Sequence, residues 1–175
     1  KICYQIDKFK PKNFIIANKN VFLKVKKKYL DKKVNIYNDF EDLKNKKKKV
    51  DITVAAIPGI QGLKPTIFFA KQSKKILLAN KEAIICGWKL IQDISKRQNL
   101  KIIPIDSEHF SIYHLIQNYK KNQIEQIYIT ASGGPFLKTP LTKFKNIKPK
   151  DALKHPKWNM GKKISIDSAT LMNKV

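Results

Sequence analysis

The sequence has few of the residues that mark secreted, membrane-spanning or nucleic-acid-reading proteins. Cys3 and Cys86 are its two cysteines, and they are too far apart in sequence to suggest a metal-type pair or a disulfide framework. No apolar run approaches the ~20 residues that cross a bilayer. Arg97 is the only arginine, although arginine is the residue that binds phosphates and bases bidentately. We therefore expect a reduced, cytosolic setting, with no membrane and no nucleic-acid partner.

Negative charge is also scarce, because 13 acidic residues face 37 basic ones and the formal net charge is +24. Such an excess can bind polyanions, so a basic nucleic-acid-binding module is an alternative hypothesis. The chain is also rich in Ile and Asn, and AT-rich coding explains the lysine excess more simply. We expect the lysine runs at 26–28 and 46–49 to be solvated surface.

The apolar residues are those of a folded α/β protein. They make up 42% of the chain and recur in short segments, which excludes a disordered chain. Strands are predicted at 14–17, 34–37, 51–57, 75–79 and 101–105, and helices at 2–9, 21–29, 39–44, from 63 onward and at 81–97. This alternation predicts a mostly parallel sheet with helices on both faces.

The pattern changes beyond residue 105, and we place a domain boundary near residue 100. The later part is predicted to contain a helix at 107–117, a strand at 126–131, a short helix at 150–154, a loop at 155–161 and a final helix that begins at Asp167 or Ser168.

Two carboxylates, Asp106 and Glu108, follow the strand predicted at 101–105. Ligands bind at the carboxyl ends of strands in open α/β sheets, and carboxylate oxygens suit a hard divalent cation. The alternative is a pair of acids that stabilise a helix N-terminus. A metal site needs more than two ligands, so a third acid should exist elsewhere, and His109 beside them is ambiguous.

Other segments carry residues suited to anions. Asn80 is placed to cap a helix that starts with Lys81 and Glu82 at another strand end. The Ser132-Gly133-Gly134 stretch could form an anion-binding nest or an ordinary turn.

The later segments offer similar chemistry. The 155–161 loop could close over a substrate, or Trp158 could anchor it to the core. Ser168, at the expected helix start, would offer phosphate a hydroxyl and a helix N-terminus, with Asn173 and Lys174 beyond it.

Together these segments resemble the 1-deoxy-D-xylulose-5-phosphate reductoisomerase family over almost the whole chain. The resemblance rests on residues 55–63, 78–82, 104–109, 132–136 and 155–174. It implies an enzyme that uses NADPH and Mg²⁺ or Mn²⁺ to rearrange and reduce this sugar phosphate in non-mevalonate isoprenoid biosynthesis. It implies a Rossmann-like NADPH-binding domain in residues 1–100 and the start of an α+β catalytic domain in residues 101–175.

The resemblance also implies roles for individual residues. Catalytic residues would be Lys81, Asp106, Glu108 and Trp158, with Asp106 and Glu108 as metal ligands and with Trp158 and Met160 in a flap. Substrate contacts would be Lys81, Ser107, Glu108, Ser132, His155, Ser168, Asn173 and Lys174. Cofactor contacts would be Lys19, Asn20, Asn80, Glu82 and Gly161.

The chain also departs from the family pattern. The glycine-rich turn of the cofactor domain is expected before Lys1 and the third metal-binding Glu after Lys174, so we interpret the chain as a fragment that is inactive and poorly soluble alone. Asn18 and Val175 stand where the family usually has Gly. A full-length protein would be a homodimer of the bacterial cytoplasm, with a plastid setting not excluded. A different phosphate-substrate NADP dehydrogenase is a further alternative.

Overall fold

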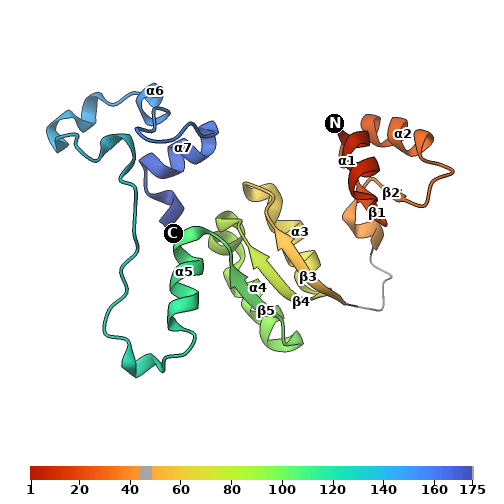
Figure 1. The fold of residues 1–175 in the computed structure, drawn as a ribbon, viewed down its shortest axis with the longest axis horizontal. Coiled ribbons are helices and arrows are strands. Elements are labelled where there is room, and N and C mark those ends of the chain that lie inside the picture. Colours follow the sequence, from red (N-terminus) through yellow and green to blue (C-terminus); the bar gives the residue numbers. More distant parts are fainter. Residues whose placement is uncertain (44–48, 175) are drawn as a thin grey trace. The chain divides into compact units, whose positions relative to one another are not determined.

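The chain folds into two compact units, Lys1–Lys49 and Val50–Val175 (Figure 1). The structure is a computed structural model that describes residues 1–43 and 49–174. Each unit has its own hydrophobic core, and the division at residue 49 reflects packing. A boundary between a cofactor-binding and a catalytic part was expected near residue 100, and it stays a prediction.

The first unit is a small α/β layer built on two parallel strands. Its elements are α1 (Ile2–Phe9), β1 (Asn13–Ile15), α2 (Lys19–Lys28), β2 (Asn35–Tyr37) and the 3₁₀ helix η1 (Phe40–Leu43). Asn13 pairs with Asn35, and Ile15 with Tyr37. The helices bury one apolar stripe each on the strands, which forms a core from Ile6, Ile16, Val25, Tyr29 and Ile36.

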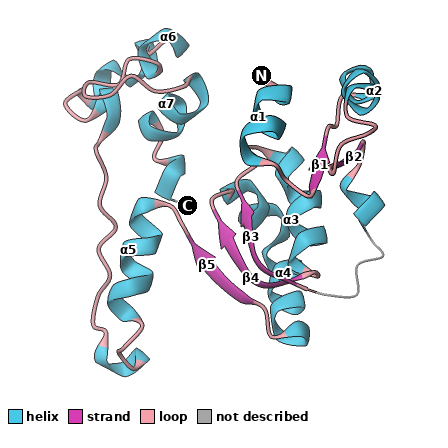
Figure 2. Ribbon diagram, turned by 45° about the vertical axis from the view of Figure 1, so that its right-hand side comes forward, coloured by secondary structure: helices cyan, strands magenta, loops and turns pink. Residues whose placement is uncertain are grey.

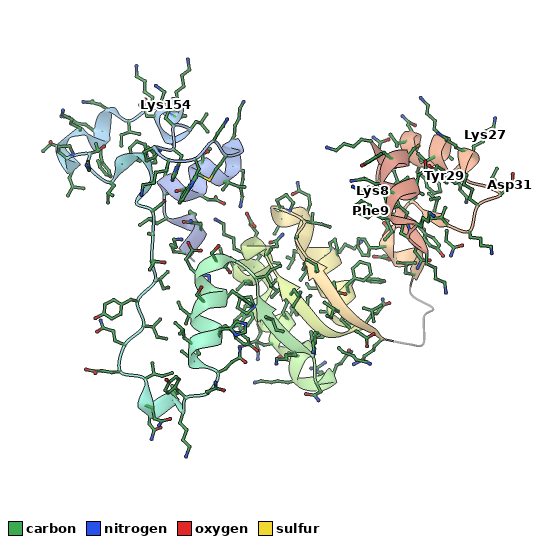
Figure 3. All side chains as sticks on the ribbon, viewed as in Figure 1. Lys8, Phe9, Lys27, Tyr29, Asp31 and Lys154 are labelled. Carbon is green, nitrogen blue, oxygen red and sulfur yellow. The ribbon has the colours of Figure 1, made fainter. Side chains whose placement is uncertain are left out.

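Helix α2 begins at a polar cap and ends in lysines. The Asn18 side chain accepts a hydrogen bond from the Val21 backbone at 3.0 Å, so α2 starts two residues before the predicted position. Its last turn holds the lysine run 26–28, which is exposed as predicted, and Lys27 points outward (Figure 3). Three lysines of the 46–49 run lie outside the described residues.

The second unit begins with a three-stranded parallel sheet in the order β3-β4-β5 (Figure 2). Its elements are β3 (Val50–Ala55), the 3₁₀ helix η2 (Ile60–Gly62), α3 (Leu63–Ala70), β4 (Ser73–Leu78), α4 (Lys81–Gln98) and β5 (Lys101–Pro104). The core joins sheet and helices through Ala55, Ala70, Ile76, Leu78, Ile94 and Leu100. The strands and helices that the sequence predicted up to residue 105 are present, although the helix predicted at 39–44 is the 3₁₀ helix η1 and residue 44 lies outside the described residues.

One detail of this sheet differs from the prediction. Both crossovers, through α3 and through α4, move in the same direction along the sheet, and right-handed crossovers then place both helices on one face. On the other face of β3, Ile52 and Val54 are more than half exposed. Helices on both faces would need a crossover in the opposite direction, which this part of the chain does not contain.

The remainder of the second unit is mostly helical and irregular. It contains α5 (Ser107–Ile116), η3 (Lys121–Gln123), η4 (Gly134–Phe136), η5 (Leu141–Asn146), α6 (Pro149–Ala152), α7 (Lys162–Ala169) and η6 (Met172–Lys174). The strand predicted at 126–131 is wrong, because that segment has no strand partner among the described residues. The final helix was predicted to begin at Asp167 or Ser168, whereas α7 nearly ends there. Among the described residues, no helix has the length and apolarity to span a membrane.

Candidate functional site

The carboxyl ends of the three parallel strands bring the predicted site segments to one edge of the sheet. Ala55 pairs with Leu78, and Leu78 with Pro104, so the chain leaves all three strands at the same level. The residues that follow are the 56–59 turn, the Asn80–Glu82 segment and the Asp106–Glu108 segment. This edge is where ligands bind in open α/β sheets.

Asn80 ties two of these segments together. Its Oδ1 atom accepts from the Ala83 backbone N–H at 2.7 Å, which confirms the predicted cap of α4. Its Nδ2 group donates to the carbonyl groups of Ile57 and, at 3.0 Å, Gly59. Asn80 is buried, and both amide donors are in use, so any cofactor contact of its side chain would fall on Oδ1.

Asp106 and Glu108 lie at the start of α5. Asp106 caps the helix, because its Oδ1 atom accepts from the His109 backbone at 2.9 Å and lies 2.6 Å from the His109 ring Nδ1. Glu108, in the first turn, pairs with the ammonium group of Lys174. The structure therefore shows the helix-start role that was the alternative for these acids, while metal binding stays a prediction.

Asp106 and Glu108 are the two predicted metal ligands, and the described residues place no third ligand with them. Within residues 1–43 and 49–174, His, Cys, Asp and Glu form no group of three that could hold a metal ion. Ser107 lies between the two acids, and its side chain is exposed at the first position of α5. The donor set fits a hard divalent cation in chemical type, since it consists of carboxylate oxygens.

A network of four charged groups joins the start of α4 to α7. Lys81 Nζ lies 2.9 Å from Asp167 Oδ2 and donates to the Met172 carbonyl group at 2.7 Å. Lys163 Nζ lies 2.6 Å from the same Asp167 oxygen and 2.8 Å from Glu82 Oε1. The Lys81 and Asp167 side chains are only 16% and 17% exposed, so this pair is shielded from solvent.

The network shifts the pKa values of Asp167, Glu82 and Lys163. Burial raises the pKa of the Asp167 carboxyl, but the bonds from Lys163 and Lys81 outweigh burial and hold that pKa below its ordinary value. Burial likewise raises the pKa of the Glu82 carboxyl, but the hydrogen bond from Lys163 lowers it, and the net result is a pKa below the ordinary value. Burial lowers the pKa of Lys163, but its two carboxylate partners raise it above the ordinary value.

A second cluster joins Ser132, His155 and Ser168. Ser132 Oγ lies 3.2 Å from His155 Nε2 and 3.3 Å from Ser168 Oγ. His155 Nδ1 accepts the backbone N–H groups of Lys157 and Trp158 at 3.2 and 3.1 Å. Because Nδ1 accepts in both bonds, the proton of the neutral ring lies on Nε2 and points to Ser132.

Close backbone packing holds this cluster together. Gly133 and Gly134 have φ values of 79° and 59°. A Cβ atom on Gly134 would lie 2.9 Å from the Ser168 carbonyl oxygen, so only glycine allows this approach to α7. The turn and α7 therefore position Ser132 and Ser168 for each other.

The predicted loop carries an exposed tryptophan. Residues 155–161 form no helix or strand, and the Trp158 ring stacks on His155 with centroids 4.9 Å apart. Trp158 is 57% exposed, so the alternative in which it anchors the loop to the core is wrong. An exposed ring on a hinge-like loop fits a flap, which stays a prediction.

Several predicted site residues are placed differently from expectation. Ser168 lies in the last turn of α7, so it offers a hydroxyl group but no helix N-terminus, and that part of its interpretation is wrong. Asn173 Oδ1 is buried without a hydrogen-bond partner among the described residues. Gly161 caps α7 and has open space around it. Lys19 and Asn20 lie exposed in the first turn of α2, in the first unit.

Two charged residues of the site were missed from the sequence. Asp167 was considered only as a helix start, and Lys163 was given no role. Their spacing of four residues is the usual one for an ion pair along a helix, which was the available signal. Nothing in the local pattern indicated that Lys81 and Glu82 would complete the network.

The parallel sheets and the polar side chains at the sheet's carboxyl edge define a Rossmann-like α/β protein. Comparison with known proteins identifies the family. The sequence profile described as 1-deoxy-D-xylulose 5-phosphate reductoisomerase matches residues 1–87, and that of the reductoisomerase C-terminal domain matches residues 102–175. The chain belongs to the 1-deoxy-D-xylulose 5-phosphate reductoisomerase family.

Individual relatives agree with this assignment. The chain is 52% identical to the reductoisomerase of Pelagibacter ubique over 178 aligned residues, which cover all of the chain and 46% of that protein. It is 44% identical to the Clostridium novyi reductoisomerase, of which it covers 46%. The chain thus spans about half the length of the curated relatives it matches.

Solved structures show the same fold. A DOX-P reductoisomerase crystallised with NADPH, fosmidomycin and magnesium superimposes with a TM-score of 0.79 at 35% identity, over 99% of the chain and 46% of that protein. The Zymomonas mobilis reductoisomerase in complex with NADPH gives a TM-score of 0.77 at 33% identity, over 93% of the chain and 42% of that protein.

Proposed function

We propose that the protein containing this chain converts 1-deoxy-D-xylulose 5-phosphate to 2-C-methyl-D-erythritol 4-phosphate, a step of non-mevalonate isoprenoid biosynthesis. The observation that carries the proposal is that one segment, α7 with η6, contacts residues from several predicted site segments. Ser168 contacts Ser132, the Met172 carbonyl group accepts from Lys81, and Lys174 pairs with Glu108. Residues that resemble the family's substrate positions thus converge from three other parts of the sequence on a single segment.

The substrate phosphate would lie at the Ser132 cluster. Two hydroxyl groups and the Nε2–H group of His155 can all donate to phosphate oxygens. Asn173 lies in the segment that follows α7; its Oδ1 atom is buried with no hydrogen-bond partner in the part of the chain that the structure describes, and its Nδ2 group could donate to a phosphate oxygen. Lys174 would add a positive charge, because an ammonium group binds phosphate as a point charge.

The reacting end of the substrate would lie at the sheet edge. Asp106 and Glu108 would hold Mg²⁺ or Mn²⁺ there, and the bound ion would supply Lewis-acid polarisation of substrate oxygens. Lys174 pairs with Glu108 in this structure, so a bound ion would replace its ammonium group at this carboxylate and would release Lys174 to the phosphate. Ser107 and Lys81 would contact the substrate beside these acids, and Trp158 on its loop would cover the site and exclude water.

NADPH would bind through the predicted cofactor positions. Asn80 fixes the turn between β3 and α3 relative to the start of α4, which shapes the edge of the sheet beside Glu82. Gly161 presents backbone with open space around it. Lys19 and Asn20 are exposed and could contact the polar part of a nucleotide. When bound, NADPH would supply the hydride that reduces the rearranged substrate.

Domain roles and cellular setting belong to the same proposal. Residues 1–100 would form part of the NADPH-binding domain, and residues 101–175 part of the catalytic domain. The full-length protein would be a homodimer in the bacterial cytoplasm.

Absorbance measurement of NADPH oxidation tests the proposed function. The protein that contains this chain should oxidise NADPH when 1-deoxy-D-xylulose 5-phosphate and Mg²⁺ are both present, and much more slowly when either is omitted. A folded protein that shows no substrate-dependent oxidation with Mg²⁺ or Mn²⁺ would contradict the proposal.

A further inference from the structure

Lys81 occupies a position where its charge is locally unfavourable. It is the first residue of α4, and the N-terminus of a helix carries partial positive charge that repels an ammonium group. Glu82, its neighbour in the same turn, binds Lys163. The carboxylate that compensates Lys81 therefore comes from a distant part of the sequence.

That carboxylate belongs to Asp167. Its Oδ2 atom accepts from Lys81 at 2.9 Å and from Lys163 at 2.6 Å, so one oxygen bridges the start of α4 and the middle of α7. The Met172 carbonyl group supplies the second acceptor of Lys81, at 2.7 Å. With both acceptors in place, the ammonium group of this long and otherwise flexible side chain is fixed at two points.

The bridge is shielded where it meets Lys81 and open where it meets Lys163. The Lys81 and Asp167 side chains are 16% and 17% exposed, whereas Lys163 is half exposed. A shielded pair loses little to solvent and salt screening, in contrast to surface pairs such as Lys89–Asp93 on the same helix. The shielded geometry makes Asp167 the main determinant of where the Lys81 ammonium group lies.

We propose that Asp167 is a positioning residue, which holds Lys81 at the site and, through Lys163 and Glu82, ties α7 to the first turn of α4. Lys81 contacts substrate under the proposed function, on which the catalytic part of this inference rests. Asp167 itself touches neither substrate nor metal in this account. It acts by keeping the ammonium group oriented and close to the sheet edge.

Amine-acylation footprinting, read by peptide mass spectrometry, tests the position of Lys81 without any turnover. In the wild type, Lys81 should be acylated at least tenfold more slowly than Lys89, whose side chain is 82% exposed. Hydrogen bonds to charged groups contribute on the order of ten- to hundredfold in equilibrium terms, so Asp167→Asn should raise Lys81 labelling about tenfold. The matched control Asp93→Asn breaks the surface pair of Lys89 and should leave Lys81 labelling unchanged.

Kinetics then separate positioning from simple stabilisation. Asp167→Asn should lower kcat/KM of the folded fraction by at least about tenfold, beyond any loss of melting temperature, and Asp167→Glu should restore most of the loss because it keeps the carboxylate. Asp93→Asn should retain wild-type kinetics. A purely structural role would instead lower the melting temperature of Asp167→Asn and leave kcat/KM of the folded fraction unchanged.

The outcomes distinguish this inference from the proposed function. If Asp167→Asn exposes Lys81 but the wild type shows no turnover, the function fails and the positioning role stands. If the wild type turns over and Asp167→Asn changes neither Lys81 labelling nor kcat/KM, the positioning role is overturned. If Asp167→Asn does not fold, the acylation rates of Lys81 and Lys89 in the wild type test the inference. Equal rates for the two lysines would overturn it.

Discussion

The Nε2 atom of His155 lies 3.2 Å from the Ser132 hydroxyl oxygen, while its Nδ1 atom accepts two backbone N–H groups of its own loop. The ring therefore serves two purposes at once. Nδ1 orders the turn that carries Trp158, and the proton on Nε2 is directed toward the Ser132–Ser168 pair.

Substitution of His155 should separate these two purposes. His155→Asn can keep an acceptor near the Nδ1 position but loses the Nε2 donor, whereas His155→Ala loses both. We expect both variants to bind inorganic phosphate about tenfold more weakly, since one hydrogen bond to a charged group is lost. Only His155→Ala should speed hydrogen exchange of the Lys157 and Trp158 amides. Wild-type phosphate affinity in His155→Asn would contradict this assignment.

Gly134, which packs on α7, and Gly161, which caps α7, should respond differently to alanine. At Gly134, φ is 59° and the added Cβ would meet the Ser168 carbonyl oxygen at 2.9 Å, so Gly134→Ala should destabilise the protein by at least ~1–2 kcal/mol. Gly161→Ala meets nothing within 4 Å and should leave the melting temperature near the wild-type value. Equal melting temperatures of the two variants would show that the turn does not pack on α7 as described.

Asn80 should matter more to stability than an ordinary helix cap. Asn80→Ala removes the cap of α4, worth about 1 kcal/mol, and also the part-buried hydrogen bonds to the Ile57 and Gly59 carbonyl groups, worth about 0.5–1.5 kcal/mol each. Asn18→Ala removes only the exposed cap of α2 and should cost about 1 kcal/mol in its own unit. Urea titration followed by circular dichroism measures both. Similar losses for the two variants would exclude the tying role of Asn80.

These examples show which features the sequence could predict. The cap at Asn80, helix α4 and the strands before residue 105 depend on local signals, namely a polar cap and short β-branched runs, and the structure confirms them. The start of α7 was missed because Gly161, Lys162 and Lys163 are not a typical helix start, since cations there oppose the helix dipole. Helix α7 is supported instead by tertiary pairs such as Lys163–Glu82.

The predicted strand at 126–131 failed for a related reason. Ile127 and Ile129 alternate with polar residues as in a strand, and both are about half exposed. Alternation reports a preference for extended backbone, but a strand also needs a partner, and sequence pattern does not specify one. Likewise, the sequence shows the four-residue spacing of Lys163 and Asp167, whereas the contact of Asp167 with Lys81 depends on the fold.

Acid should weaken the contact between α7 and α4. The folded-state pKa of Asp167 lies below its ordinary value, so its contribution to stability is fully present above about pH 4 and is lost as pH falls toward the folded-state value. Lys163 has a raised pKa, so its contribution is present below about pH 10 and is lost as pH rises beyond the folded-state value. Between pH 6 and pH 3 the melting temperature should therefore fall less steeply in Asp167→Asn than in the wild type. Parallel curves would contradict the ion-pair network.

The central claim is that α7 and η6 assemble one site that holds the phosphate of 1-deoxy-D-xylulose 5-phosphate at Ser132, His155 and Ser168. Calorimetric titration with this compound and with unphosphorylated 1-deoxy-D-xylulose tests it most directly, in the wild type and in Ser168→Ala. We predict that the wild-type protein prefers the phosphorylated sugar by at least about a hundredfold, from two or more charge-assisted hydrogen bonds, and that Ser168→Ala loses about a tenfold part of this preference. Equal affinity of the wild type for both sugars would contradict the account.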